Sequence, residues 1–112
     1  MTLEVSGEEI AREVRFWELL GFTRADPPPD LAQSFAWLQR SGTQIHLMRS
    51  ESPSVPRHGH VAVVVPDFDD AVGRLRAEGI EVAPKRERWG SPRAEARTPT
   101  GHRVELMLSP PG

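Results

Sequence analysis

Apolar residues in the first half of the chain recur at helical spacing and then at alternating spacing. A first group lies three or four positions apart, which predicts one apolar helix face. Its members are Ile10, Val14, Trp17 and Leu20. Ser6 and Glu9 have the S-x-x-E spacing of a capping box, so we expect this helix to begin at Ser6 and to end before Gly21. Strands are expected at 22–25, 34–39 and 43–48.

The second half of the chain repeats this order of elements. Residues 60–65 form an unbroken run rich in β-branched side chains, which predicts a buried strand that Pro66 ends. Asp67 is placed to cap a second helix, and Gly79 can take the left-handed conformation that ends it. Further strands are expected from residue 80, at 95–97 and at 103–108, with a turn at 99–101 before the last.

Two short segments at equivalent places match each other, which indicates an internal repeat. Residues 45–48 (IHLM) match residues 104–107 (VELM), which follow 59 positions later. We therefore expect an α+β fold of two tandem β-α-β-β-β modules, residues 1–52 and 58–109, within a single domain. One helix covers only one face of each module's sheet, so the two modules are expected to form a curved mixed sheet around a cavity.

Composition and charge are those of a soluble globular domain. The 112 residues suit one domain, and the 38% of hydrophobic residues include no run long enough to span a membrane. With no cysteine and no secretory signal in residues 1–4, a cytoplasmic location is expected. A net charge of -2 argues against a nucleic-acid partner. The densest basic stretch, 85–97, is typical of a solvated surface, although it would also suit an anionic substrate.

Alternation along the predicted strands places potential metal ligands on the cavity side of the sheet. His46 lies between two core residues, and Glu105 holds the equivalent position in the second module. His60 opens the first strand of that module. Two imidazoles and one carboxylate suit a divalent ion such as Fe(II), Mn(II), Ni(II) or Zn(II), with positions left for water or substrate. A single histidine on a sheet is, however, more typical of a hydrogen-bonded structural residue.

Other side chains predicted to face the cavity are candidates for binding a substrate, and the tryptophans among them can stack on a planar ligand. The substrate-binding candidates are Trp37, Gln44, Met48, Trp89 and Arg103. Trp17 is instead expected in the core. His58 and His102 are interpreted as structural residues, because one precedes a strand and the other occupies a turn.

Three motifs that together span most of the chain carry a resemblance to a known family. Residues 16–22 (FWELLGF) are similar to an F-[YW]-x-x-L-G-F signature at the end of a first helix. Residues 60–67 (HVAVVVPD) are similar to the strand that opens a second module. Residues 98–106 (TPTGHRVEL) are similar to a D-P-x-G-N-x-[IV]-E-[LF] ending, with Thr98 and His102 in place of Asp and Asn. The chain thus resembles the vicinal-oxygen-chelate family of glyoxalases, bleomycin-resistance proteins and extradiol dioxygenases.

The resemblance implies a metal site that is incomplete in this sequence. Metal-binding members of that family place a ligand on the first and last strand of each module, and His46, His60 and Glu105 stand at three of these four positions. The fourth position would fall just ahead of Met1. Water could replace the missing ligand, metal binding could have been lost, or the translation start could lie upstream; the sequence leaves all three open.

Two functions follow from the resemblance. A metal-dependent enzyme of lyase, isomerase or dioxygenase type would hold a divalent ion (Zn, Ni, Mn or Fe) on His46, His60 and Glu105 and use Glu105 in catalysis. A metal-free protein of the bleomycin-resistance type would instead sequester a small antibiotic in a cleft between modules. The enzyme is favoured slightly, because three ligand-type residues all fall at ligand positions. The resemblance also implies a homodimer with a small-molecule partner. The lack of a long apolar run argues against a membrane partner.

Overall fold

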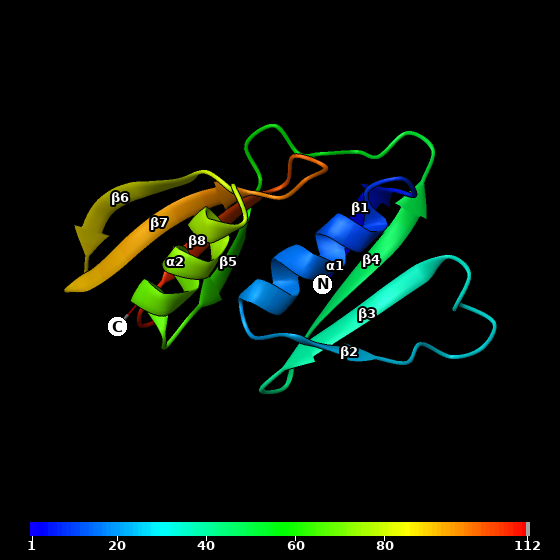
Figure 1. Cartoon of the computed structure of the whole chain (residues 1–112), viewed down its shortest axis with the longest axis horizontal. Coiled ribbons are helices and arrows are strands. Elements are labelled where there is room, and N and C mark those ends of the chain that lie inside the picture. The colour runs from blue at the N-terminus through cyan, green and yellow to red at the C-terminus, as the bar shows by residue number, and fades with distance from the viewer. Residues whose placement is uncertain (112) are drawn as a thin grey trace. The chain divides into compact units, whose positions relative to one another are not determined.

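The computed structural model of the chain describes residues 1–111 and consists of two compact units (Figure 1). Unit 1 spans Met1–Val55, and unit 2 begins at Pro56. The boundary falls in the segment that the sequence places between its two modules. None of the described helices is both long enough and apolar enough to cross a membrane.

Unit 1 contains one helix and a four-stranded mixed sheet. In chain order its elements are β1 (Thr2–Ser6), α1 (Ile10–Leu19), β2 (Thr23–Ala25), β3 (Phe35–Arg40) and β4 (Thr43–Ser50). The strands lie in the order β1-β4-β3-β2, with β1 parallel to β4 and the other neighbours antiparallel. The first and last strands of the module therefore lie side by side.

Unit 2 repeats this topology. In chain order its elements are β5 (Val61–Val64), α2 (Phe68–Ala77), β6 (Val82–Arg88), β7 (Ser91–Arg97) and β8 (Arg103–Met107), and its strands lie in the order β5-β8-β7-β6. Thr2 lies opposite His46 in unit 1, and Ala62 lies opposite Glu105 in unit 2, so the parallel strand pairs correspond in register. The α+β fold class and the internal repeat expected from the sequence are confirmed.

The core of unit 1 forms between α1 and the sheet face that carries Ile45. This side chain is almost fully buried, as strand alternation predicts. Trp17 of α1 is wholly buried, and its ring meets those of Phe16 and Phe22 edge-on, with centroid distances of 5.2 and 5.4 Å. Because aromatic rings bury a large apolar area, this cluster stabilises the packing of α1 on the sheet.

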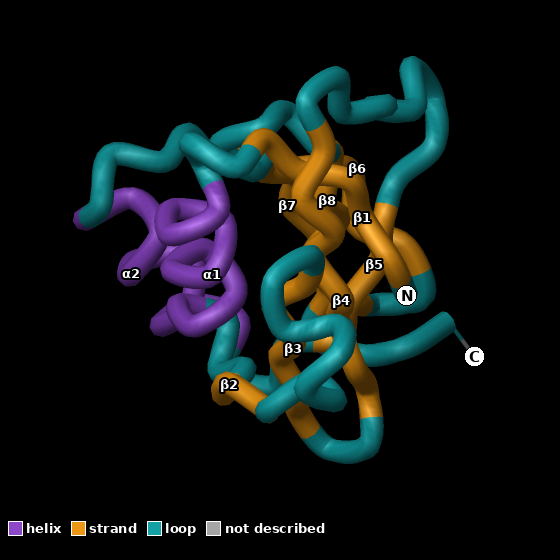
Figure 2. Tube along the Cα trace, turned by 90° about the vertical axis from the view of Figure 1, so that its right-hand side faces the viewer, coloured by secondary structure: helices purple, strands orange, loops and turns teal. Residues whose placement is uncertain are grey.

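Unit 2 builds its core from smaller, mostly branched side chains. Val61 and Val63 of β5, Leu106 of β8 and Leu75 of α2 are all buried. In each unit the helix lies on one side of its strands (Figure 2). We call the other side of each sheet, which no helix of the same unit covers, the open face of that unit. The predicted cavity-side residues of β3, β4 and β8 lie on these open faces.

The first predicted helix start is wrong, whereas the second predicted cap is confirmed in position. The first helix begins at Ile10 rather than at Ser6, with Glu9 at the N-cap position and no side-chain capping bond. Ser6 is instead the last residue of β1, and its hydroxyl accepts a hydrogen bond from the backbone N–H of Glu8 at 3.3 Å. Asp67 is the N-cap residue of α2, as predicted, although its side chain makes no capping bond. Pairing of β1 with β4 continues through Ser6, and this tertiary contact outweighs the local capping preference.

Strand limits differ from the prediction mainly around the hairpin between β6 and β7. The prediction began the later strand at residue 95, but β7 starts at Ser91 and β6 continues to Arg88. The chain turns at Trp89 and Gly90, both with positive φ, so the two strands pair along most of their length. These strands contain many charged residues, so their sequences lack the alternation of apolar and polar positions that predicts a strand.

Candidate functional site: two open sheet faces

The open face of unit 1 carries the predicted residues of β3 and β4. Gln44, His46 and Met48 alternate with the buried Ile45 and Leu47, so the predicted side of the strand is confirmed. The cross-strand register adds three residues of β3 to this face. They are Phe35 opposite Met48, Trp37 opposite His46, and Gln39 opposite Gln44.

His46 is held between an aromatic ring and an amide. Its imidazole stacks on the Trp37 indole, with ring centroids 4.0 Å apart and planes 4° from parallel. Its Nε2 lies 2.9 Å from the Gln44 side-chain oxygen. That oxygen is an acceptor, so Nε2 donates the hydrogen and Nδ1 is left as an acceptor. This arrangement fixes the tautomer and the orientation of the ring.

The charge state of His46 follows from its surroundings. Burial, and secondarily the positive charge of the Met1 amino group, lower the pKa of His46 below the ordinary imidazole value. The ring is therefore neutral at neutral pH. A neutral, stacked imidazole with one nitrogen donating can accept a hydrogen bond from a ligand through the other nitrogen.

The open face of unit 2 is charged. Registers among β6, β7 and β8 place its polar side chains in three rows that run across the strands. The first row contains Lys85, Arg93 and Met107; the second contains Glu95 and Glu105; the third contains Arg97 and Arg103. The middle row is negative and the rows on either side are positive.

Glu105 lies at the centre of this face and is paired with two cations. Its Oε1 accepts hydrogen bonds from Arg93 Nη2 at 2.6 Å and from Lys85 Nζ at 3.2 Å. Burial by itself raises the pKa of Glu105, but the hydrogen bonds and charges of Arg93 and Lys85 outweigh burial and hold the pKa below the ordinary carboxyl value. Glu105 is therefore an ionised, internally neutralised carboxylate at neutral pH.

The remaining predicted residues of unit 2 are Trp89, Arg103 and His60. Trp89 lies at the turn between β6 and β7, is 39% exposed, and donates from Nε1 to the Ser109 carbonyl at 3.0 Å. Arg103 Nε lies 2.8 Å from Glu95 Oε1. His60 is exposed and precedes β5, which begins at Val61 rather than at residue 60 as predicted.

Glu105 does not fit the role of a metal ligand in this arrangement. Its Oε1 is already engaged by Arg93 and Lys85, and a divalent ion would add two positive charges beside two existing cations. His46 belongs to unit 1, whereas His60 and Glu105 belong to unit 2. Within each unit, the described residues contain no group of three metal-ligating side chains. The three-ligand site therefore stays a prediction.

The residues that neutralise Glu105 were not among those predicted from the sequence. Lys85 and Arg93 lay inside a basic stretch to which no role was given, and Glu95 was not singled out. The alternation of Arg93, Glu95 and Arg97 along β7 is a signal that these side chains share one face. That signal is visible only when the strand is known to begin at residue 91.

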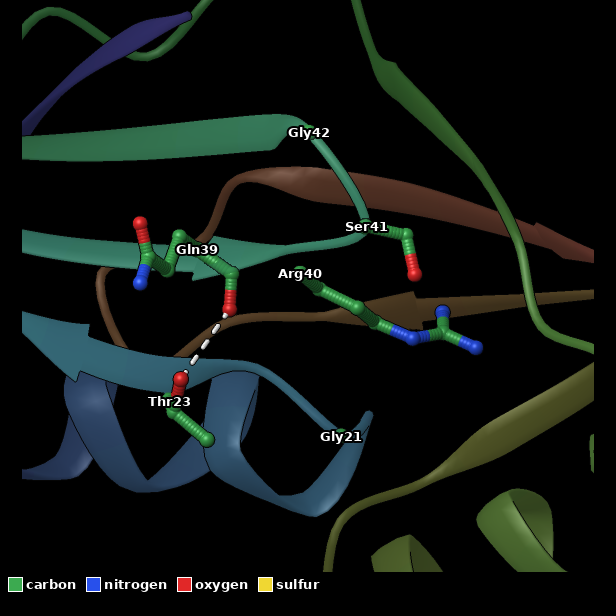
Figure 3. A pocket seen from close by; sticks show the side chains of 6 residues that line it. All are labelled: Gly21, Thr23, Gln39, Arg40, Ser41 and Gly42. Atoms are coloured by element: carbon green, nitrogen blue, oxygen red, sulfur yellow. Dashed lines mark hydrogen bonds between the residues drawn. The ribbon is translucent and has the colours of Figure 1, made fainter.

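A separate polar pocket lies at the hairpin end of unit 1 (Figure 3). It has a volume of about 580 Å³ and is lined by Gly21, Thr23, Gln39, Arg40, Ser41 and Gly42. One hydrogen bond, from Thr23 Oγ1 to the Gln39 carbonyl at 3.4 Å, crosses its wall (Figure 3). None of the predicted site residues lines this pocket, so it is not the predicted ligand site.

The chain matches the model of a known protein family. A family model described as the Glyoxalase/Bleomycin resistance protein/Dioxygenase superfamily matches residues 3–106. This match covers nearly the whole chain, including every predicted site residue. No match was found among the curated proteins.

Several solved structures share this fold. A glyoxalase family protein from Bacillus anthracis is 23% identical with a TM-score of 0.82, over 95% of this chain and 88% of that chain. A glyoxalase/dioxygenase from Nostoc punctiforme is 21% identical with a TM-score of 0.78, over 99% and 89% of the two chains. A bleomycin resistance determinant encoded on the transposon Tn5 is 18% identical with a TM-score of 0.67, over 97% and 96%. At these identities the likeness concerns the fold alone.

Proposed function

Because this chain belongs to the Glyoxalase/Bleomycin resistance protein/Dioxygenase superfamily, we propose that it binds a small organic molecule without a metal ion on Glu105. One observation carries the proposal: Glu105 Oε1 accepts hydrogen bonds from both Arg93 and Lys85. A carboxylate paired in this way holds protein side chains in position and has little negative charge to offer a cation. The protein is then closer in function to ligand-sequestering members of the family than to metal-dependent members.

Each open face offers different contacts to such a molecule. On unit 1, Trp37 and Met48 provide apolar surface, while Gln44 and His46 provide polar groups beside it. A few polar groups on an apolar surface are typical of small-molecule sites, because the apolar surface supplies affinity and the polar groups supply orientation. On unit 2, Trp89 and Arg103 are the corresponding predicted residues.

The metal-dependent enzyme is the competing proposal. It is favoured by the equivalence of His46 and Glu105, which lie opposite Thr2 and Ala62 in matching strand pairs. In that case His46, His60 and Glu105 would hold a divalent ion, which would polarise substrate oxygens. Arg93 and Lys85 would have to release Glu105 before it could act as a ligand. The need for this release makes the enzyme the less supported function.

The test is metal content and ligand binding measured on one preparation. Untagged protein would be analysed for metals after incubation with Zn, Ni, Mn or Fe(II) and desalting, and a panel of small aromatic compounds would be screened by thermal shift with chelator present. We expect well under one equivalent of metal and at least one stabilising compound. Near-stoichiometric metal that the His60→Ala, Glu105→Ala double variant loses, and that His58→Ala retains, would contradict the proposal.

We also propose that the protein acts as a homodimer, as the family resemblance implies, and that it is cytoplasmic, which its cysteine-free composition favours. Sedimentation equilibrium of the purified protein would measure the mass directly. A mass of one chain at micromolar concentration would exclude a stable dimer and leave the ligand proposal unaffected.

A further inference from the structure

The open face of unit 2 has a positive charge, although the chain as a whole is negative. The register and ion pairs place four cationic and two anionic side chains on this face. They are Lys85, Arg93, Arg97 and Arg103 against Glu95 and Glu105. These six side chains together carry an excess of two positive charges, while the net charge of the chain is -2. Such a concentration of one sign raises the local concentration of ligands of the opposite sign.

The two glutamates hold the cations in place and are neutralised in doing so. Glu95 and Glu105 lie directly opposite each other on neighbouring strands, an arrangement that by itself destabilises a sheet. Each glutamate instead forms salt bridges with cations: Glu105 with Arg93 and Lys85, and Glu95 with Arg103. Both carboxylates are used within the face, so the excess positive charge is left for a ligand.

Arg93 is the best anchor for an anion on this face. Only 10% of its side-chain surface is exposed, and its Nη1 and Nη2 donate to the Arg86 carbonyl and to Glu105. Its Nε is buried and has no hydrogen-bond partner among residues 1–111. A guanidinium has five N–H donors in one plane, and a desolvated guanidinium with an unmet donor favours an oxyanion, which can accept two hydrogen bonds in parallel.

An exposed aromatic ring lies beside this anchor. The Arg93 Cζ atom is 5.5 Å from the centroid of the Trp89 ring, which is 39% exposed. Trp89 has a positive φ of 43° at the hairpin turn, an uncommon conformation for a bulky residue, and its Nε1 is fixed by the Ser109 carbonyl. A planar apolar group attached to an oxyanion would contact the indole while its charge meets Arg93.

We propose that unit 2 binds its ligand through an oxyanion, a carboxylate or a phosphate, held by Arg93 and Lys85 beside the Trp89 ring. The inference rests on the proposed small-molecule function and names the class of ligand for the same open face. Glu105 is a positioning residue in this site: it orients both cations and competes with the ligand for them. The basic stretch at 85–97 is then a binding segment rather than a solvated surface.

If Glu105 has this role, its replacement by glutamine should affect ligand affinity in the opposite direction to the replacement of a metal ligand. Replacing a carboxylate metal ligand by glutamine removes a negative charge that the metal needs and weakens metal binding. Replacing Glu105 by glutamine removes a charge that opposes the anion, while the amide oxygen still accepts from Arg93. The Glu105→Gln variant is therefore expected to bind anions at least as tightly as the unmodified protein.

The experiment is a titration of the full chain with phenyl phosphate, benzoate and uncharged benzamide, followed by amide chemical shifts in ¹H-¹⁵N spectra with chelator present. We expect both anions to shift amides of β6, β7 and β8, and added salt to weaken this binding. Arg93→Gln and Lys85→Gln should each weaken binding about tenfold, as expected for loss of a charged hydrogen bond. Glu105→Gln should tighten it by about threefold, as expected for removal of one competing charge at moderate screening.

Arg12→Gln is the matched control, because it removes the same charge from a largely exposed side chain of α1 in unit 1. It should leave the anion affinity unchanged. Arg93 is buried, so its variant can lose stability. The Lys85 side chain is 29% exposed, and Lys85→Gln therefore provides a second measurement of the anion affinity. The inference is overturned if neither anion shifts unit 2, if both cation variants bind like Arg12→Gln, or if Glu105→Gln abolishes anion binding.

Failure of this inference differs from failure of the proposed function. If benzamide or another neutral compound binds while both anions do not, the ligand is uncharged: the oxyanion site is wrong and metal-free ligand binding stands. If metal binds stoichiometrically through Glu105, both are wrong. Binding of the anions with loss of affinity in Arg93→Gln and Lys85→Gln supports both.

Discussion

The Nη2 of Arg93 lies 2.6 Å from the Oε1 of Glu105, with 10% and 8% of their side-chain surfaces exposed. The two residues are diagonal neighbours on β7 and β8, since Glu95 is directly opposite Glu105. A buried ion pair of this kind is stable only while both members are present, because either charge alone would be desolvated without compensation. The position that the family resemblance assigns to a metal ligand is thus part of an internal ion pair, and this relationship determines most of what we expect from variants of the protein.

Glu105→Ala is expected to lower the free energy of unfolding by about 3 kcal/mol, because it leaves the nearly buried Arg93 without its carboxylate. Glu105→Gln should cost less, since its amide oxygen can still accept from Arg93. Urea unfolding followed by far-UV circular dichroism measures both values. Glu95→Ala is the control: its partner Arg103 is 25% exposed, so the loss should be below about 1 kcal/mol. Equal losses for Glu95→Ala and Glu105→Ala would contradict the special position of Glu105.

Acid should remove the stabilisation that Glu105 provides. Its pKa is lower in the folded chain than the ordinary value of 4.5, so the unfolded chain binds the proton more readily. The contribution is complete above pH 4.5 and is lost as the pH falls through the lower, folded-state pKa. We expect the stability difference between the unmodified protein and Glu105→Gln to shrink as the pH falls through this window. A difference that stays constant in unfolding measurements from neutral to strongly acidic pH would refute the assignment.

His46 should make the protein more sensitive to mild acid. Because its pKa is lowered from 6.5 in the folded chain, the unfolded chain takes up the proton first. Its contribution to stability is complete above pH 6.5 and declines as the pH falls through the folded-state pKa. Imidazole ¹H shifts measured against pH should give a midpoint below 6.5 for His46. The variant His46→Phe, which keeps a ring to stack on Trp37, should flatten the stability profile in this range more than the exposed-site control His58→Ala.

Two tryptophan variants should separate the core from the proposed ligand surface. Trp17→Ala removes a wholly buried ring with two edge-on aromatic contacts and is expected to cost about 3–5 kcal/mol. Trp89→Ala removes a 39% exposed ring and should cost about 1 kcal/mol or less, while weakening the binding of phenyl phosphate. Thermal unfolding and the anion titration measure the two effects. If Trp89→Ala destabilises as much as Trp17→Ala, the Trp89 ring is a core residue and does not form a ligand surface.

Much of the fold could be predicted from local sequence patterns. The helical spacing of residues such as Val14 and Trp17 predicted the buried face of α1, and the period of two along β4 predicted that His46 and Ile45 point to opposite sides. The repeat of the IHLM segment predicted that Glu105 would hold the position of His46, and the strand registers agree. These features were predictable because each depends on residues close together in the sequence.

The start of α1 and the limits of the hairpin strands were harder to predict from the sequence. The capping box at Ser6 was a sound local signal. Pairing of β1 with β4 extends through Ser6, however, and the helix begins only at Ile10. The strands β6 and β7 contain more charge than apolar alternation, so their hairpin was recognised only in part. At the helix start a contact between distant residues outweighed the local preference, whereas in the hairpin charged side chains obscured the strand pattern.

The sequence by itself determined most of the elements, the repeat and the side of each strand on which His46 and Glu105 lie, because backbone periodicity is a local property. Only the tertiary structure decided what those side chains meet. Lys85 and Arg93 reach the carboxylate of Glu105 because the registers of β6, β7 and β8 place the three residues on one face, although they are up to 20 positions apart in the chain. The energy of a charged group depends on its neighbours in space and on its burial, and strand pairing sets both.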